Sequence, residues 1–246
     1  MIETLHIAAQ YLATAAISFI EKKDDDSHTN LGWKNHSLVT HAFPNGDALR
    51  LNYKTYALEW QHNNGAIDSW PLDEKTHQQT LAWLTSKAAS SEMANAYSYN
   101  LHYDLPYPKI VGDTVFKLNS QEEIDKLMAQ RDLAQASLET VLKSGDYQSS
   151  IRIWPHHFDT GAFVTTNAGL GIGLGMAIPD TLINDFYLYV SAYKGHDAVE
   201  LPSDTTIGLG RYYNNSWKGF ALPVSRLSEQ EAISFFSEAM ACYLRQ

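Results

Sequence analysis

The sequence predicts an α+β fold, in which helices pack onto antiparallel β-sheet. Two turn sequences that contain Asn-Gly separate strand-like runs in the first half of the chain, which indicates an antiparallel meander. Amphipathic helices are predicted at both ends, and most of the second half has strand character. We expect one compact unit over residues 1–246, with two lobes, 1–145 and 146–246, as the alternative.

Composition and charge argue against several classes of partner. The chain has 246 residues, of which 44% are hydrophobic, and a formal net charge of −10. A chain of this kind buries a core, and its charge is repelled by phosphate backbones and anionic membrane surfaces. We therefore expect neither nucleic acid nor a membrane as a partner, whereas the oligomeric state stays open. The single cysteine, Cys242, cannot form an internal disulfide, which favours a reducing, cytoplasmic setting.

A helix is predicted at the start of the chain, followed by the meander. Polar residues recur every three or four positions in the first helix, which predicts a mostly buried helix with a narrow stripe toward solvent. The stripe comprises Glu3, His6, Gln10, Thr14, Ser18 and Glu21. The turns at 44–47 and 62–65 then separate three predicted strands, namely 33–43, 48–61 and 66–72.

Two helices and one strand are predicted between the meander and the second half. Asp73 is expected to cap the first of these helices. The run 96–104 alternates between tyrosine or leucine and polar residues, which predicts a strand. The capping-box pattern of Ser120 and Glu123 predicts the start of a second helix, which Gly145 ends.

Glycine and tyrosine alternate on two predicted strands of the second half. In residues 169–178 the glycines keep a period of two, which favours a strand over a dinucleotide-binding loop. If this strand forms a hairpin with 185–193, three tyrosines lie opposite small residues. The expected cross-strand pairs are Tyr187 with Ala177, Tyr189 with Gly175, and Tyr193 with Gly171. The rings then either cover the glycines or form the floor of a ligand site.

The chain is predicted to end in two strands and a helix. The strands flank the turn 214–217, and the helix begins after Ser228, which forms a capping box with Glu231. The expected buried stripe of this helix comprises Ile233, Phe236, Met240 and Leu244. Cys242 lies beside this stripe and is interpreted as a small structural residue.

Two histidine–aspartate pairs carry the clearest chemical signal. His102 and Asp104, and also His157 and Asp159, are two residues apart on predicted strands, so each pair is expected to share a face. Such pairs can contribute to a divalent metal site, of zinc, iron or manganese, with ligands from both pairs. Alternatively, the aspartate orients the imidazole for proton transfer. The structural interpretation is a polar network beside Pro155, which cannot continue a β-ladder.

Further candidate residues surround the stretch 151–161, "IRIWPHHFDTG". His156 is a candidate catalytic residue together with His157 and Asp159, provided that a bulge turns both histidines to one side. Arg152 and Arg211 are candidates for binding a carboxylate or phosphate group, or else pair with acidic neighbours. Trp154, Tyr187 and Tyr189 are expected to supply the walls of a ligand pocket.

The order of these motifs resembles that of a family of uncharacterised bacterial proteins of unknown function. The resemblance is carried by "DDSHTNLGW", "LHYD" and above all "WPHHFD", and it covers most of the chain in layout. This sequence has His157-Phe-Asp159 where one branch of the family has a longer insertion. The resemblance implies relatives but no activity.

Together these patterns predict a small-molecule-binding protein or enzyme with a His/Asp site in a pocket. The pocket is expected where the strand of His157 and Asp159 meets the glycine and tyrosine strands. The alternative is a non-enzymatic structural or interaction protein whose His/Asp pairs form local hydrogen bonds. A third hypothesis is a sheet that curls around the last helix and encloses a cavity for a lipid-like ligand.

Overall fold

The computed structural model describes residues 1–245, which fold into two compact units. Unit 1 comprises Met1–Met128 and Ile153–His156, and unit 2 comprises Ala129–Arg152 and the chain from His157 onward. Helices at both ends of the chain and two antiparallel sheets confirm the predicted α+β class. Throughout residues 1–245, every helix is too short or too polar to cross a bilayer.

Unit 1 is built on a five-stranded meander, not the three-stranded one that the sequence predicts. Its strands are β1 (Gly32–Lys34), β2 (Ser37–Val39), β3 (Ala48–Asn52), β4 (Ala57–Gln61) and β5 (Ile67–Pro71), paired in chain order. Two of the predicted strands are each divided by an additional turn. Asn35 and His36 have φ values of 50° and 57°, the left-handed conformation that a tight primed hairpin turn requires. In the second predicted strand, Tyr56 has a φ of 47° between β3 and β4.

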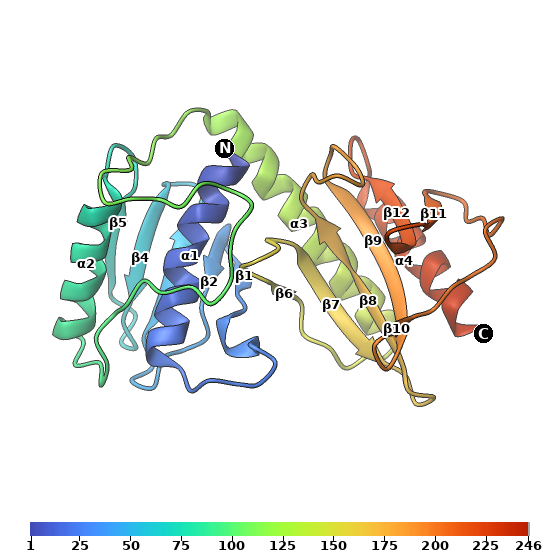
Figure 1. The fold of residues 1–246 in the computed structure, drawn as a ribbon, viewed down its shortest axis with the longest axis horizontal. Helices are drawn as coiled ribbons and strands as arrows, with labels where there is room; N and C mark the ends of the chain where they lie inside the picture. The colour runs from blue at the N-terminus through green and yellow to red at the C-terminus, as the bar shows by residue number, and fades with distance from the viewer. Residues whose placement is uncertain (246) are drawn as a thin grey trace. The chain divides into compact units, whose positions relative to one another are not determined.

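Two helices accompany this sheet. Helix α1 (Ile2–Phe19) lies across one face of the sheet and contacts β3 (Figure 1). Helix α2 (His77–Ser90) begins after Thr76, which forms a capping box with Gln79. Asp73 does not cap α2 as the sequence predicts, because its carboxylate accepts a hydrogen bond from the backbone N–H of Leu118 (2.7 Å).

The strand predicted at 96–104 is wrong. No β-ladder forms there, and the segment crosses over α1 instead (Figure 1). The predicted alternation of burial is nevertheless present, since Tyr97 is buried and Ser98, Asn100 and His102 are exposed. An extended chain that lies on a helix shows the same period of two as a strand in a sheet.

Helix α3 (Gln121–Ser144) contains the boundary between the two units. The Ser120 hydroxyl accepts a hydrogen bond from the backbone N–H of Glu123 (3.2 Å), as the capping pattern predicts. The Glu123 carboxylate pairs with the N-terminal ammonium group of Met1 (3.1 Å). The helix ends at Ser144, and Asp146 then adopts a left-handed φ of 52°.

The sheet of unit 2 has the strand order β11-β12-β9-β8-β7-β6, and β10 also pairs with β9. The strands are β6 (Arg152–Ile153), β7 (Thr160–Thr165), β8 (Leu170–Ala177), β9 (Tyr187–Lys194), β10 (Asp197–Ala198), β11 (Arg211–Asn214) and β12 (Lys218–Pro223). The predicted register of β8 and β9 is confirmed. The observed pairs are Ala177 with Tyr187, Gly175 with Tyr189, and Gly171 with Tyr193.

Helices α3 and α4 (Glu229–Leu244) contact the same face of this sheet. From α3, Arg131 reaches Thr160 of β7, and from α4, the Tyr243 ring packs against Phe220 of β12. In the observed register Thr160 and Phe220 share a face, whereas Gly161, Gly175 and Tyr189 lie on the other.

Helix α4 confirms the predicted capping box but corrects the predicted stripe. Ser228 and Glu231 cap the helix reciprocally. Phe236 and Met240 are buried, but Leu244 is 45% exposed. The buried face also includes Ala232, Phe235, Ala239, Cys242 and Tyr243. The stripe is therefore rotated toward Phe235 and Tyr243.

Candidate functional site

The stretch that contains the two histidines and Asp159 is not a continuous strand. Strand β6 ends at Ile153, a turn covers Pro155 to His157, and β7 begins at Thr160. Phe158 has a φ of 60°, in the left-handed region that interrupts an extended chain. The expectation that His157 and Asp159 share one face of a strand is therefore wrong.

Residues Ile153–His156 of this stretch belong to unit 1. The Pro155 carbonyl oxygen accepts two hydrogen bonds from α1, from His6 Nε2 (2.7 Å) and from Gln10 Nε2 (2.9 Å). The His156 ring lies 5.5 Å from the Tyr103 ring and 6.0 Å from the Trp154 ring, measured between centroids. Trp154 and His156 thus pack as aromatic contacts within unit 1.

Asp159, in unit 2, is directed toward a tyrosine. Its Oδ2 accepts a hydrogen bond from the Tyr189 hydroxyl (2.6 Å), while its buried Oδ1 has no hydrogen-bond partner among residues 1–245. Burial raises the pKa of Asp159, and the hydrogen bond from Tyr189 and the charge of the exposed His157 oppose this shift. Burial and the neighbouring Asp159 charge raise the pKa of Tyr189 as well.

A buried arginine fixes the backbone beside this aspartate. Arg131 has no exposed surface, and its guanidinium donates to the Thr160 hydroxyl (2.7 Å) and to the Phe158 carbonyl (3.1 Å). The guanidinium also stacks on the Phe158 ring, 4.4 Å from its centroid. Arg131 therefore holds the left-handed turn that places Asp159 against Tyr189.

The glycines beside Tyr189 are covered by aromatic side chains. A Cβ atom at Gly161 or Gly175 would lie 2.7 or 2.8 Å from the Tyr189 hydroxyl. At Gly171 the nearest atom would be a ring carbon of Phe163, at 2.4 Å, and not Tyr193. On this face of the sheet, aromatic rings therefore cover the glycines, which was the first of the two alternatives.

The other histidine–aspartate pair is separated into two local contacts. His102 Nε2 lies 3.1 Å from Asp26 Oδ2, and Asp104 Oδ1 lies 3.2 Å from Lys109 Nζ. Within residues 1–245, His, Cys, Asp and Glu side chains form no group of three or more that could hold a metal ion. The predicted metal site thus has no ligand cluster in the described structure.

The remaining predicted ligand residues make separate local contacts in unit 2. The half-buried Arg152 has a pKa lowered by burial. Arg211 stacks on the Tyr213 ring at 4.4 Å, and both line a cavity of about 430 Å³. Tyr187 donates a hydrogen bond to Asp180 Oδ2 (2.8 Å). Among the predicted ligand residues Arg152, Trp154, Tyr187, Tyr189 and Arg211, the lining of this cavity contains Arg211.

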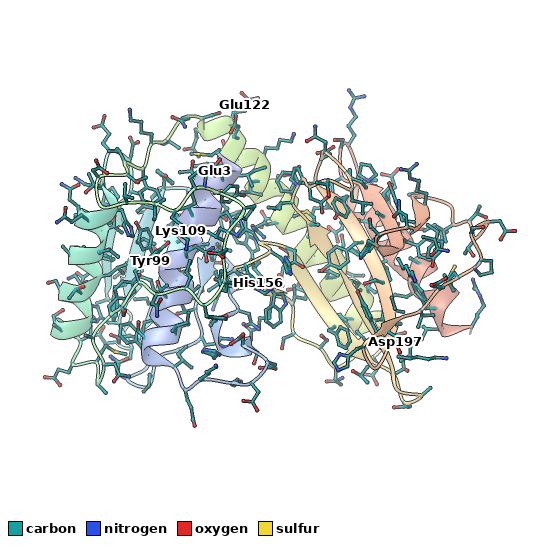
Figure 2. All side chains as sticks on the ribbon, in the orientation of Figure 1. Glu3, Tyr99, Lys109, Glu122, His156 and Asp197 are labelled. Atoms are coloured by element: carbon teal, nitrogen blue, oxygen red, sulfur yellow. The ribbon has the colours of Figure 1, made fainter. Side chains whose placement is uncertain are left out.

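A cavity of about 350 Å³ lies in unit 1, and the sequence analysis did not identify it. Tyr99 and Lys109, both labelled in Figure 2, contribute to its lining. The lining includes Ile7, Tyr99, Leu101, Tyr103, Tyr107 and Lys109. The signal in the sequence was the spacing of four between the tyrosines at 99, 103 and 107.

A row of hydrogen bonds joins α1 to the segment 97–107, which we name the tyrosine segment and which supplies most of the cavity lining. Four polar residues of α1, which we name the polar row, take part. The pairs are His6 Nδ1 with the Tyr107 hydroxyl (3.3 Å), Gln10 Oε1 with Tyr103 (2.7 Å), Thr14 Oγ1 with Tyr97 (2.7 Å), and Ser18 Oγ with the Ser98 backbone N–H (3.0 Å). The middle of the stripe predicted to face solvent is therefore covered, since His6, Gln10 and Thr14 are almost fully buried. Its two ends, Glu3 and Glu21, are exposed as predicted.

A second buried pair, Tyr11 and His77, packs against Tyr99. The Tyr11 hydroxyl lies 2.7 Å from His77 Nδ1, and the His77 ring meets the Tyr99 ring edge-on at 4.8 Å. Burial lowers the pKa of His77, which favours a neutral imidazole, and raises the pKa of Tyr99. The wall formed by Tyr99 is therefore aromatic and uncharged at neutral pH.

Comparisons with protein-family models, with curated proteins and with solved structures gave no match to this chain. The resemblance to the uncharacterised bacterial family stays a prediction.

Proposed function

We propose that this protein binds a small molecule in the cavity of unit 1. The main support is that the aromatic wall is fixed before a ligand arrives. Tyr103 and Tyr107 line the cavity, and their hydroxyls are bonded to the buried side chains of Gln10 and His6. A wall that is already ordered loses little conformational entropy on binding.

The size and lining of the cavity agree with this proposal. Pockets for small ligands have volumes of roughly 300–1,000 Å³ and combine apolar walls with a few polar groups. This cavity, at about 350 Å³, is at the small end of that range. Ile7, Leu101 and Ile110 contribute apolar surface, while Asn100 and Asp104 contribute polar groups.

The histidine–aspartate pairs have a structural role in this proposal. His102 contacts Asp26, and Asp159 contacts Tyr189, each within its own unit. These contacts favour local hydrogen-bond networks, as in the alternative hypothesis from the sequence. We propose binding without assigning a reaction, in a cytoplasmic protein whose one cysteine is buried and free.

Ligand-observed NMR with a library of small aromatic and heteroaromatic fragments tests this proposal. We expect saturation transfer to several fragments with the wild-type chain and its loss in Leu101→Trp, which fills the cavity. The matched control is Ile183→Trp, which fills the cavity of unit 2 and should leave these signals unchanged. Equal signals from Leu101→Trp and the wild type would contradict the proposal, provided that both have native circular dichroism.

A further inference from the structure

We infer that the ligand of the unit 1 cavity is an organic cation that donates hydrogen bonds, a small primary ammonium with an apolar body. This inference rests on the proposed function, since it specifies the chemistry of the same cavity. It follows from the direction of the hydrogen bonds in the cavity wall.

The orientation of Gln10 determines the direction of the Tyr103 hydroxyl. One end of the Gln10 amide lies 2.8 Å from the His6 carbonyl oxygen and 2.9 Å from the Pro155 carbonyl oxygen. Both partners can only accept hydrogen bonds, so this end is the NH₂ group. The other end, Oε1, faces Tyr103 and can only accept, so Tyr103 donates its single proton to it (2.7 Å).

The same reasoning applies to Tyr107. His6 Nε2 lies 2.7 Å from the Pro155 carbonyl oxygen and must therefore carry a proton. When the His6 ring is neutral, Nδ1 is an acceptor and the Tyr107 hydroxyl donates its proton to it (3.3 Å). The Tyr103 hydroxyl therefore directs its one proton toward α1 and has only lone pairs to offer a ligand, and the Tyr107 hydroxyl does the same when the His6 ring is neutral.

The charges in the lining favour a cation as well. Asp104 supplies a carboxylate, and the faces of tyrosine rings attract cations. Lys109 is the one cationic residue of the lining, is 89% exposed in its side chain, and pairs with Asp104, which is 84% exposed. An exposed pair of this kind is weak, so a ligand ammonium can replace that of Lys109 beside Asp104.

Three probes with the same ring separate charge from shape: benzylammonium, benzyl alcohol and benzoate. We measure their dissociation constants for the full chain by NMR chemical-shift titration at pH 7 and low ionic strength. Benzylammonium is expected to bind about tenfold more tightly than benzoate, because the Tyr103 lone pairs and the Asp104 carboxylate attract an ammonium donor and repel a second carboxylate. Benzyl alcohol is expected to lie between them.

Two surface variants with opposite expected effects test the roles of Asp104 and Lys109 in ligand binding. Asp104→Asn should weaken benzylammonium binding about threefold to fivefold, which corresponds to the loss of one exposed charge contact. Lys109→Gln should strengthen it, because a competing cation is removed. Both residues are exposed, so neither substitution should impair folding. Weaker benzylammonium binding in Lys109→Gln would overturn the inference.

The outcomes distinguish this inference from the proposed function. If benzoate or benzyl alcohol binds as tightly as benzylammonium, and Leu101→Trp abolishes that binding, the cavity binds ligands but the inference is wrong. The same conclusion follows if the fragment screen yields only neutral or anionic ligands. If all three probes and the fragment library fail to bind, the proposed function fails, and the inference fails with it.

Discussion

Asp159 combines an unfavourable environment with a fixed position. One carboxylate oxygen is bonded to Tyr189 and the other is buried without a partner among residues 1–245. A buried acceptor of this kind costs about 1–3 kcal/mol of stability. Protonation reduces the cost because it removes the charge, which is why burial raises the pKa of Asp159.

The pH dependence of unfolding tests this environment. The folded state holds the Asp159 proton more tightly than the unfolded chain, whose carboxyl has a pKa near 3.8. The stability from this group is therefore complete below pH 3.8 and is lost as the pH rises through the folded pKa. We expect Asp159→Asn to gain stability relative to the wild type as the pH is raised from about 4 to 8.

Urea unfolding of the wild type and Asp159→Asn across this pH range measures the difference. Asp204→Asn, at an exposed position of unit 2, is the control and should show a constant difference from the wild type. A pH-independent difference for Asp159→Asn as well would show that its surroundings do not raise the pKa of the Asp159 carboxyl.

The polar row of α1 and the tyrosine segment form one structural element. The residues of the polar row are four apart on the helix, and each is bonded to a residue of the tyrosine segment. Because Gln10 has no exposed surface and bonds to three groups, its amide joins α1, the tyrosine segment and Pro155. The element should therefore respond as a unit when Gln10 is changed.

Replacement of Gln10 by methionine keeps the volume of the side chain but removes these bonds. We expect a loss of about 2–4 kcal/mol in the free energy of unfolding, since the Pro155 carbonyl and the Tyr103 hydroxyl lose a buried partner. The double variant Gln10→Met, Tyr103→Phe should lose less than the sum of the two single changes, because it removes both sides of one bond.

Denaturant unfolding of the four proteins in this cycle gives the coupling free energy. Glu3→Gln, an exposed change on the same helix, is the control and should alter stability by less than about 0.5 kcal/mol. Strict additivity of Gln10→Met and Tyr103→Phe would contradict the hydrogen bond between these residues.

A secondary-structure element can be predicted from the sequence when its residue pattern has a single physical explanation. The Gly/Tyr hairpin was predictable in register, because cross-strand pairing joins large to small side chains. The tyrosine segment was not, because a period of two reports alternating burial and not the partner that causes it. The polar stripe of α1 was misinterpreted for the same reason, since polar residues with a buried partner resemble residues in water.

The cavity could not be predicted from its own residues alone. Ile7 and Tyr103 come from distant parts of the sequence and meet only after α1 has packed on the sheet. The "WPHHFD" motif suggested one site, but its residues are divided between the two units after His156. The motif therefore marks the point where the chain passes from unit 1 to unit 2. The contacts of its side chains could be known only from the folded structure.

The distribution of tryptophan allows the two units to be followed separately. Trp33, Trp60, Trp70, Trp83 and Trp154 belong to unit 1, and only Trp217 belongs to unit 2. In a Trp217→Phe background, tryptophan fluorescence reports on unit 1, whereas circular dichroism reports on both units.

A substitution in unit 2 should then change the two signals differently. In Gly175→Ala the new Cβ would lie 2.3 Å from the Thr160 carbonyl oxygen, so we expect a loss of about 1–3 kcal/mol in unit 2. The circular dichroism transition should shift to lower urea concentration, and the fluorescence transition should stay in place. Gly173→Ala, whose nearest neighbour would be 3.5 Å away, is the control. Equal shifts of both signals in Gly175→Ala would show that the chain unfolds as one cooperative unit.

The bonds from His6 and Gln10 to the Pro155 carbonyl have a consequence for biosynthesis. The partners are 149 and 145 residues apart, so α1 leaves the ribosome long before Pro155 is made. At synthesis rates of about 5–20 residues per second, this interval is roughly 7–30 s. During this time the two donors that will bond to Pro155, His6 Nε2–H and Gln10 Nε2–H, depend on water for their hydrogen bonds. The segment Ile153–His156, which completes unit 1, is therefore translated after the rest of that unit.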